Sequence, residues 1–263
     1  MRLTVDDANI FAATGGKPFD PALPLVVFLH GAGFDHSIWA LPARWFAHHG
    51  HAVLAPDLPG HGRSGGKALG SIADMADWTV RLIKAAGATR ARLVGHSMGS
   101  LIALETASRH PDAVSEISLL AAGASMKVSP DLLAAAEANQ HDAIDMVSIW
   151  GHGFRASLGG SRAPGLWMLG GGERVLEAAP PGVLHSDLAA CNAYTGALEA
   201  AASLAIPATL ILGERDMMTP LRSGTELAGA IKGARRVVLA GAGHMLTAER
   251  PDEVLAALIG GRV

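Results

Sequence analysis

One serine of the sequence lies between two glycines, at the point where a short apolar run becomes a helix-forming run. The run Arg92-Leu93-Val94 leads into Gly95-His96-Ser97-Met98-Gly99, and Ser100-Leu101-Ile102-Ala103-Leu104 follows. The pattern predicts a strand, a sharp turn and a helix, with Ser97 in a strained conformation that requires glycine on both sides. Such a turn presents the Ser97 hydroxyl as a nucleophile. As the first residue of the helix, Met98 points a free backbone N–H at the position of an oxyanion.

Two further residues have the types and positions that a serine nucleophile needs. Asp216 follows the apolar run 207–213, and His244 follows the run 236–239 within Gly241-Ala242-Gly243-His244-Met245. A serine hydroxyl is a poor nucleophile without a base, which His244 supplies, and Asp216 fixes the histidine tautomer and stabilises the imidazolium. The chain order Ser, Asp, His is the order expected when the three groups come from successive strand ends. Glu214 is the alternative acid.

The segments around these residues alternate between strand and helix. An amino-terminal hairpin is expected over 2–5 and 9–13. Further strands are expected over 25–29, 52–55, 91–94, 114–120, 207–213 and 236–239, and helices over 37–49, 72–86, 98–110, 221–231 and 251–258. The almost wholly apolar run 25–29 suits a strand buried on both faces, and strands separated by helices predict an α/β fold with a mostly parallel central sheet covered by helices on both faces. Ligands of such sheets bind beyond the carboxyl ends of the strands, where all the chemistry should collect.

The alternation stops between Gly123 and about Leu204, where helix-like stretches over 132–137, 143–150 and 188–203 flank a glycine-rich run to Gly172. We therefore expect a core formed by 1–124 and 205–263 and an inserted helical cap over 125–204. The cap residues Trp150, Trp167, Met168 and Tyr194, together with Met146, are candidates for lining an apolar pocket, although ordinary core packing explains them equally well. His152 and His185 are possible polar contacts, and Cys191 is expected to be a small buried hydrophobe.

Composition restricts the function further. The 263 residues carry a formal net charge of −3 without a basic block, which gives no electrostatic footprint for nucleic acid or anionic membranes. The partner expected is a small molecule, and the sequence does not give the oligomeric state. Apolar runs are far shorter than a membrane helix, the single cysteine allows no internal disulfide, and the amino terminus is acidic where a signal peptide would be apolar. A cytoplasmic location is therefore expected.

Neither a metal nor a cofactor is predicted. His48, His49 and His51 have no carboxylate or cysteine at ligand spacing and are expected at a solvated helix end. The glycine pattern of 60–65 does not open a helix directly after a strand, so it does not predict dinucleotide binding.

Four motifs together resemble the α/β-hydrolase fold superfamily, in its serine-hydrolase form with an inserted helical cap. They are the Gly95–Gly99 turn, His30-Gly31-Ala32, Asp57-Leu58-Pro59-Gly60-His61-Gly62-Arg63-Ser64 and Gly241-Ala242-Gly243-His244. The resemblance implies a catalytic triad of Ser97, Asp216 and His244, and an oxyanion hole formed by the backbone N–H groups of Ala32 and Met98. It also implies structural roles for His30, His96 and Asp57.

The function expected is hydrolysis of a carboxylic ester, or a similar acyl bond, of a small to medium apolar substrate through an acyl-enzyme on Ser97. The same triad also serves C–C bond hydrolases, lactonases and cofactor-free perhydrolases, and the fold does not choose among them. An alternative of another class is a hydrolase-fold ligand receptor with slow or no turnover.

Overall fold

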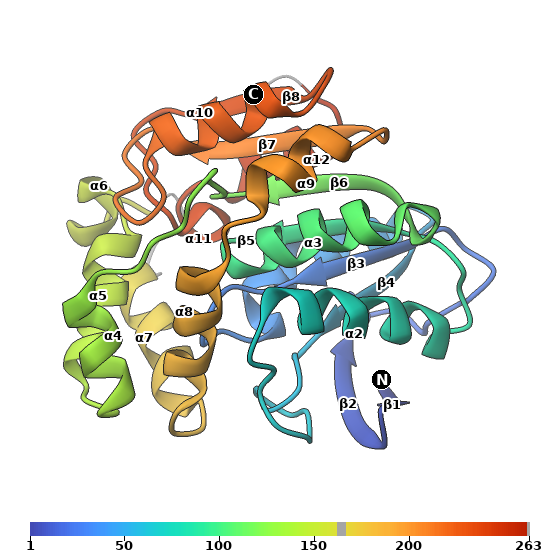
Figure 1. Cartoon of the computed structure of the whole chain (residues 1–263), viewed down its shortest axis with the longest axis horizontal. Coiled ribbons are helices and arrows are strands. Elements are labelled where there is room, and N and C mark those ends of the chain that lie inside the picture. Colours follow the sequence, from blue (N-terminus) through green and yellow to red (C-terminus); the bar gives the residue numbers. More distant parts are fainter. Residues whose placement is uncertain (162–166, 262–263) are drawn as a thin grey trace.

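A single eight-stranded sheet forms the centre of the protein, in a computed structural model that describes residues 1–161 and 167–261 (Figure 1). The strand order is β1-β2-β4-β3-β5-β6-β7-β8, and the pairs from β4 to β8 are all parallel. The strands are β1 (Arg2–Val5), β2 (Ala8–Ala13), β3 (Leu25–Leu29), β4 (Ala52–Pro56), β5 (Ala91–His96), β6 (Val114–Leu120), β7 (Ala208–Gly213) and β8 (Arg235–Leu239). The predicted hairpin β1–β2 joins the edge of the sheet because β2 pairs antiparallel with β4.

Strand β3 shows why a central strand can be apolar at every position. All five of its residues are buried. Val27 and Leu29 belong to the hydrophobic cluster on one face of the sheet, whereas Val26 and Phe28 belong to the cluster on the other face. Successive side chains of a strand point to opposite faces, so a strand with both faces covered must be apolar at every position.

Helices cover both faces of the sheet. The first cluster is closed by α2 (Ile72–Ala85), α3 (Met98–Arg109), α9 (Ala197–Ser203) and α10 (Leu221–Ala230), and the second by α1 (Ala40–His48) and α12 (Pro251–Leu258). Shorter elements are η1 (His36–Trp39), η2 (Pro111–Ala113) and α11 (Leu246–Glu249). This arrangement confirms the predicted fold class.

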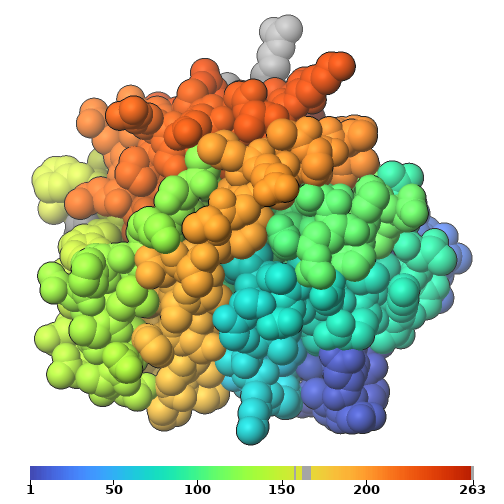
Figure 2. Space-filling view, in the orientation of Figure 1, coloured from blue at the N-terminus to red at the C-terminus, as the bar shows by residue number. Residues whose placement is uncertain are grey.

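The remaining helices lie together at the carboxyl-terminal edge of the sheet, where they form one side of the molecule (Figures 1 and 2). They are α4 (Pro130–Glu137), α5 (Asp142–Gly151), α6 (Phe154–Ser157), α7 (Met168–Ala178) and α8 (Val183–Ala193). A third hydrophobic cluster joins them to Phe34 and Met245, two residues of the core loops. The predicted cap over 125–204 includes these helices, and also α9, which packs against α3 and α10 of the core.

Two details of this region differ from the expectation. The glycine-rich run contains the start of α7, because packing outweighs the low helix propensity of Gly170, Gly171 and Gly172. A Cβ at Gly170 would overlap the ring of Trp167, so the absence of a side chain at Gly170 lets this ring pack against the start of α7. The stretch 188–203 is two helices, because Tyr194 has extended backbone geometry and ends α8, while its hydroxyl donates a hydrogen bond to Glu105 of α3 (2.7 Å).

Within the described ranges, no helix combines the length and the apolar composition needed to cross a membrane.

The contact between β3, β5 and α3 predicts the effect of a single added methyl group. A Cβ at Gly99 would overlap the carbonyl oxygen of Leu29, a backbone atom that cannot move without displacing β3. Gly99→Ala should therefore lower the free energy of unfolding by about 3 kcal/mol or more, measured by urea denaturation.

Gly229→Ala is the matched control, because a Cβ at this position of α10 meets nothing within 4 Å. It should leave stability unchanged or raise it by up to about 1 kcal/mol. Equal stability of the two variants would contradict the packing described for the turn.

Candidate active site

Ser97 lies at the turn between β5 and α3 and has strained backbone geometry. Its φ of 54° and ψ of −118° lie in a region that non-glycine residues rarely adopt. The turn is held by the Ser97 N–H, which donates to the Leu120 carbonyl of β6 (2.9 Å). Because α3 begins at Met98, the Met98 N–H has no acceptor within the helix and remains available to a ligand. The local geometry is therefore that predicted for an exposed nucleophile beside an N–H donor.

Asp216 and His244 come from the loops after β7 and β8 and form a buried pair. His244 Nδ1 lies 2.8 Å from Asp216 Oδ2. The Thr219 hydroxyl donates to the same oxygen (2.6 Å), while Asp216 Oδ1 accepts the N–H groups of Met218 (2.9 Å) and Thr219 (2.7 Å). Burial alone would raise the pKa of Asp216, but the His244 charge and these hydrogen bonds outweigh it and leave the pKa below its usual value. The ionised carboxylate thus accepts a hydrogen bond from His244 Nδ1, and Nε2 is the ring nitrogen that Asp216 does not contact.

The loop that carries His244 is fixed from three sides. The Gly151 carbonyl at the end of α5 accepts the N–H groups of both His244 and Met245 (2.9 Å each). His96 Nε2 donates to the His244 carbonyl (2.9 Å), and burial lowers the pKa of His96 to about 3, so this ring stays neutral. The buried carboxylate of Glu249 accepts the N–H groups of Gly153 (3.0 Å) and Gly243 (3.0 Å). The end of α5 and the loops after β5 and β8 therefore hold the histidine together.

Ala32 lies in the turn after β3, close to Ser97. A Cβ on the preceding Gly31 would lie 3.2 Å from the Ser97 Cβ, and Ala32 lines the same cavity as Ser97. His30 anchors the start of this turn, because Nδ1 donates to the Gly31 carbonyl (2.9 Å) and Nε2 accepts the Leu58 N–H (3.0 Å). Burial lowers the pKa of His30 to about 4, which keeps the ring neutral and able to accept that bond.

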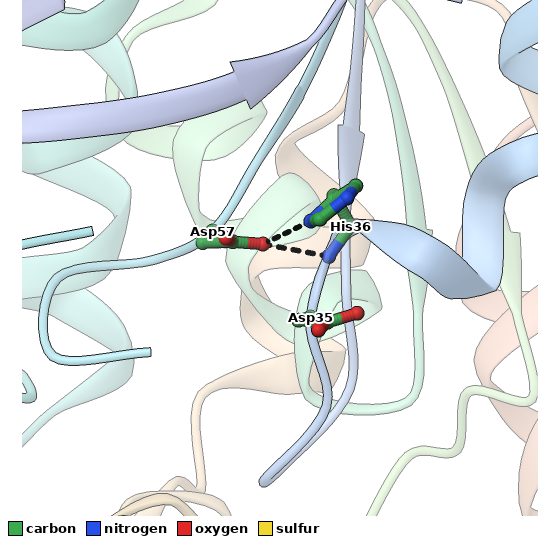
Figure 3. A group of neighbouring side chains, drawn as sticks. All are labelled: Asp35, His36 and Asp57. Atoms are coloured by element: carbon green, nitrogen blue, oxygen red, sulfur yellow. Dashed lines mark hydrogen bonds and ion pairs between the residues drawn. The ribbon is translucent and has the colours of Figure 1, made fainter. Parts of the chain in front are cut away.

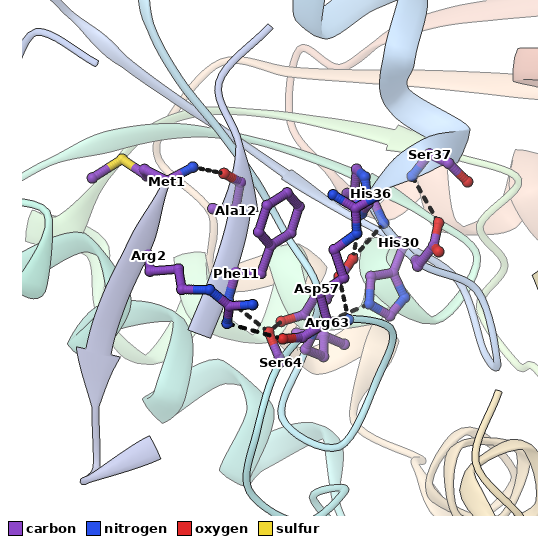
Figure 4. A network of polar contacts seen from close by, with 12 residues as sticks. Met1, Arg2, Phe11, Ala12, His30, His36, Ser37, Asp57, Arg63 and Ser64 are labelled. Atoms are coloured by element: carbon purple, nitrogen blue, oxygen red, sulfur yellow. Dashed lines mark hydrogen bonds and ion pairs between the residues drawn. The ribbon is translucent and has the colours of Figure 1, made fainter. Parts of the chain in front are cut away.

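Asp57, which follows β4, binds the loop that continues from the Ala32 turn. His36 donates both its backbone N–H (2.8 Å) and its ring Nδ1 (2.7 Å) to Asp57 Oδ1, and Figure 3 shows both nitrogens directed at the carboxylate. Asp57 Oδ2 accepts the Arg63 N–H (2.8 Å), and Ser64 links the Asp57 carbonyl to Phe11 of β2 (Figure 4).

Asp35, His36 and Asp57 are also close enough to hold a metal ion between them. Asp35 caps η1 by accepting the Ser37 N–H (2.8 Å), and both Asp57 oxygens already accept N–H groups. The hydrogen bonds account for all three side chains as parts of the loop structure.

An apolar cavity of about 250 Å³ lies beside the turn that carries Ser97. Ser97, His244 and Ala32 line it, and so does Trp150, one of the predicted pocket residues. Most of the remaining lining side chains are apolar and were not predicted to line a pocket: Phe34, Met126, Val128, Leu132, Val147, Leu184, Leu188, Cys191, Met217, Met218 and Met245.

The other predicted pocket residues lie elsewhere. Trp167, which is 64% exposed, and Met168 line a neighbouring hollow together with His152. Tyr194 hydrogen bonds to Glu105, as described above. Met146 packs in the third hydrophobic cluster. Cys191, which does line the cavity of Ser97, is the small buried residue expected, and burial raises the pKa of its thiol. The structure therefore brings Trp150, and not Trp167, Met168 or Tyr194, to the cavity of Ser97.

Sequence reasoning missed a buried ion pair behind the Ala32 turn. Asp187 of α8 lies 2.8 Å from His61 Nε2, and both side chains are almost completely buried. Burial alone would lower the pKa of His61, but the Asp187 charge and its hydrogen bond raise the pKa above its usual value. A lone acidic residue between the apolar residues Leu184, Leu188 and Cys191 was the only available signal.

A model of the alpha/beta hydrolase family matches residues 26–257. The chain belongs to this family, which confirms the resemblance drawn from the motifs.

Two curated relatives and one solved structure illustrate the similarity. The chain is 30% identical over 248 residues to a pimeloyl-(acyl-carrier protein) methyl ester esterase of Neisseria meningitidis, covering 87% of this chain and 88% of the relative. It is 32% identical over 114 residues to an (E)-2-((N-methylformamido)methylene)succinate hydrolase of Acinetobacter baylyi, which spans 43% of this chain and only 40% of that relative. The enol-lactonase of Burkholderia xenovorans LB400 superposes with a TM-score of 0.87 at 24% identity, over 99% and 98% of the two chains. These relatives support the expected hydrolase class.

The raised pKa of His61 predicts how stability depends on pH. Because the folded-state pKa lies above the unfolded value of 6.5, the ion pair contributes fully below pH 6.5, and its contribution is lost as pH rises through the folded-state pKa. Urea unfolding of the wild type and His61→Gln from about pH 6 to about pH 9 should show a stability difference that shrinks with pH. A difference that stays constant over this range would contradict a protonated His61.

Proposed function

We propose that the protein hydrolyses carboxylic esters, or similar acyl bonds, of small to medium apolar substrates through an acyl-enzyme on Ser97. The observation that carries this proposal is one apolar cavity lined by both Ser97 and His244, with His244 Nδ1 2.8 Å from the buried Asp216. Asp216 occupies Nδ1, which leaves Nε2 as the nitrogen that takes the serine proton.

Acylation follows from these roles. The Ser97 oxygen attacks the carbonyl carbon, and its proton passes to His244 Nε2. The N–H groups of Ala32 and Met98 donate hydrogen bonds to the carbonyl oxygen and stabilise the negative charge that forms on it. The tetrahedral intermediate collapses, the bond to the leaving oxygen breaks, and His244 returns the proton to the departing alcohol.

Deacylation repeats the sequence with water. His244 takes a proton from the water molecule that attacks the acyl carbon, and then protonates Ser97 as the carboxylic acid leaves. The chemistry balances without a cofactor, so the partner proposed is a small-molecule substrate alone.

The cap supports the choice of substrate. We propose residues 125–204 as a cap that supplies the acyl pocket, because most of its contributions to the cavity, such as Leu132, Val147 and Leu188, are apolar. A cavity of this size fits a small or medium acyl group rather than a long chain.

The relative named as a methyl ester esterase is consistent with ester cleavage, since it is similar over most of both chains. The structural neighbour named as an enol-lactonase supports the fold alone at 24% identity. A lactone is an ester within a ring, so the same triad can open one, and a simple lactone is assayed beside the aryl ester.

Ser97→Ala should abolish turnover of an activated aryl ester and of a simple lactone, because the proposed mechanism takes its nucleophile from the Ser97 hydroxyl. The loss should reach at least about 10⁴-fold in kcat, measured by release of the aryl alcohol, with an unchanged circular dichroism spectrum. Retained turnover would refute the assignment, and tight ligand binding by the wild type without turnover would favour a receptor.

Asp216→Asn should lower kcat by about 10⁴-fold, the loss known for the equivalent change in a serine protease, because the amide favours the wrong histidine tautomer. Glu214→Gln is the matched control for the alternative acid. Glu214 accepts the Gly241 N–H (2.8 Å), and its carboxylate has no contact with His244 among the described hydrogen bonds. A larger loss in Glu214→Gln than in Asp216→Asn would transfer the acidic role to Glu214.

A further inference from the structure

Asp187 is a fully buried carboxylate that has no part in the proposed acylation or deacylation steps. It belongs to α8 on the cap side, yet Oδ2 contacts two groups of the core: it accepts the Gly33 N–H (2.8 Å) and lies 2.8 Å from His61 Nε2. Asp187 Oδ1 has no hydrogen-bond partner within the described part of the chain. A buried charge destabilises a protein unless it is paired. The Gly33 N–H and the His61 ring are therefore the contacts that stabilise the buried Asp187 carboxylate.

His61 is held so that it faces this carboxylate. Its Nδ1 donates to the Pro59 carbonyl (3.0 Å), and its ring packs against His30 with centroids 4.9 Å apart. Both ring nitrogens face oxygen acceptors, and a histidine donates from both only as an imidazolium. Asp187 therefore has a fixed counter-charge in the core.

The Gly33 N–H lies next to the N–H that the proposed mechanism uses. The Gly31 carbonyl accepts hydrogen bonds from the Phe34 N–H (3.2 Å) and from His30 (2.9 Å), which fixes the peptide plane between Gly31 and Ala32. In a trans peptide the N–H points away from the carbonyl, so this bonding sets the direction of the Ala32 N–H.

The peptide plane on the other side of Ala32 is fixed by Asp187. Gly33 has a φ of +70°, and a Cβ there would lie only 2.9 Å from atoms of Leu176 and Leu184, both from the cap helices. The loop tip thus lies between side chains of the cap helices, and the hydrogen bond from the Gly33 N–H to Asp187 fixes its position.

We propose that Asp187 is a positioning residue through which the cap, with His61 as its partner in the core, holds the Ala32 N–H in the geometry of an oxyanion donor. The inference rests on the proposed function. It makes the cap part of the apparatus that stabilises the transition state, in addition to its role in lining the pocket.

The test separates this role from general stability. Asp187→Asn keeps the size of the side chain but removes the charge, and Asp187→Ala removes the acceptor. We expect kcat for an activated ester to fall by about tenfold in Asp187→Asn and by up to about 10²-fold in Asp187→Ala, with KM changed by less than about twofold. An alkyl boronic acid, which forms a tetrahedral adduct with serine, should bind more weakly by the same factor as the loss in kcat/KM.

Asp77→Asn is the matched control. Asp77 also pairs with a histidine, since His110 Nε2 lies 2.7 Å away, but the pair is on the surface, between α2 and the end of α3. This variant should leave kcat and boronic acid binding unchanged. If Asp187→Asn does not fold, His61→Gln serves as the second variant, which should show the same loss in kcat without a change in KM.

The outcomes are distinguishable. If the wild type shows Ser97-dependent turnover and the Asp187 or His61 variants keep kcat and boronic acid affinity within about twofold, the positioning role is refuted. A loss confined to KM would assign Asp187 to the pocket and would also refute it. If the wild type itself shows no turnover that depends on Ser97, the proposed function fails instead.

Discussion

The tight passage from β5 into α3 can form only because Gly95 and Gly99 have no side chains. A Cβ at Gly95 would overlap the carbonyl oxygen of Gly99, and a Cβ at Gly99 would overlap that of Leu29 on the neighbouring strand. Ser97 adopts a positive φ at this close backbone contact, and the strain is offset by the burial of β3 and β5 between two hydrophobic clusters, one of which includes α3.

Around this turn, buried carboxylates hold the loops on which the proposed chemistry depends. Asp216 orients the His244 ring, Glu249 fixes the backbone before His244, and Asp187 anchors the turn that contains Ala32. Each accepts N–H groups from segments far away in the sequence, so each restricts loop motion as well as carrying charge. Two of the three link the proposed cap to the rest of the chain, because Glu249 accepts the Gly153 N–H and Asp187, which belongs to α8, accepts the Gly33 N–H.

Much of the fold could be predicted from local patterns. The apolar run 25–29 coincides with β3, and the runs 207–213 and 236–239 match β7 and β8 to within one residue. β3 and β7 are buried at every position, and a short apolar run indicates such a strand. Ser97, Asp216 and His244 could be singled out because each follows such a run.

The remaining features depend on contacts that no local pattern encodes. Asp187 meets His61 across 126 residues and Gly33 across 154, and Thr219 acquires its role only from the approach of the His244 loop. In the proposed cap, Trp167 and Tyr194 were predicted to line the pocket because they are large aromatic residues. Helix packing turns one toward a neighbouring hollow and the other toward α3, which hydrophobicity alone does not predict.

Covalent labelling tests the central claim most directly, namely that Ser97 is a nucleophile activated by His244. Intact-protein mass spectrometry after reaction with an alkyl fluorophosphonate should detect a single adduct, assigned to Ser97 by peptide mapping. His244→Ala, which removes the base, should react far more slowly. Labelling of a residue other than Ser97, or an equal labelling rate in His244→Ala, would contradict the account.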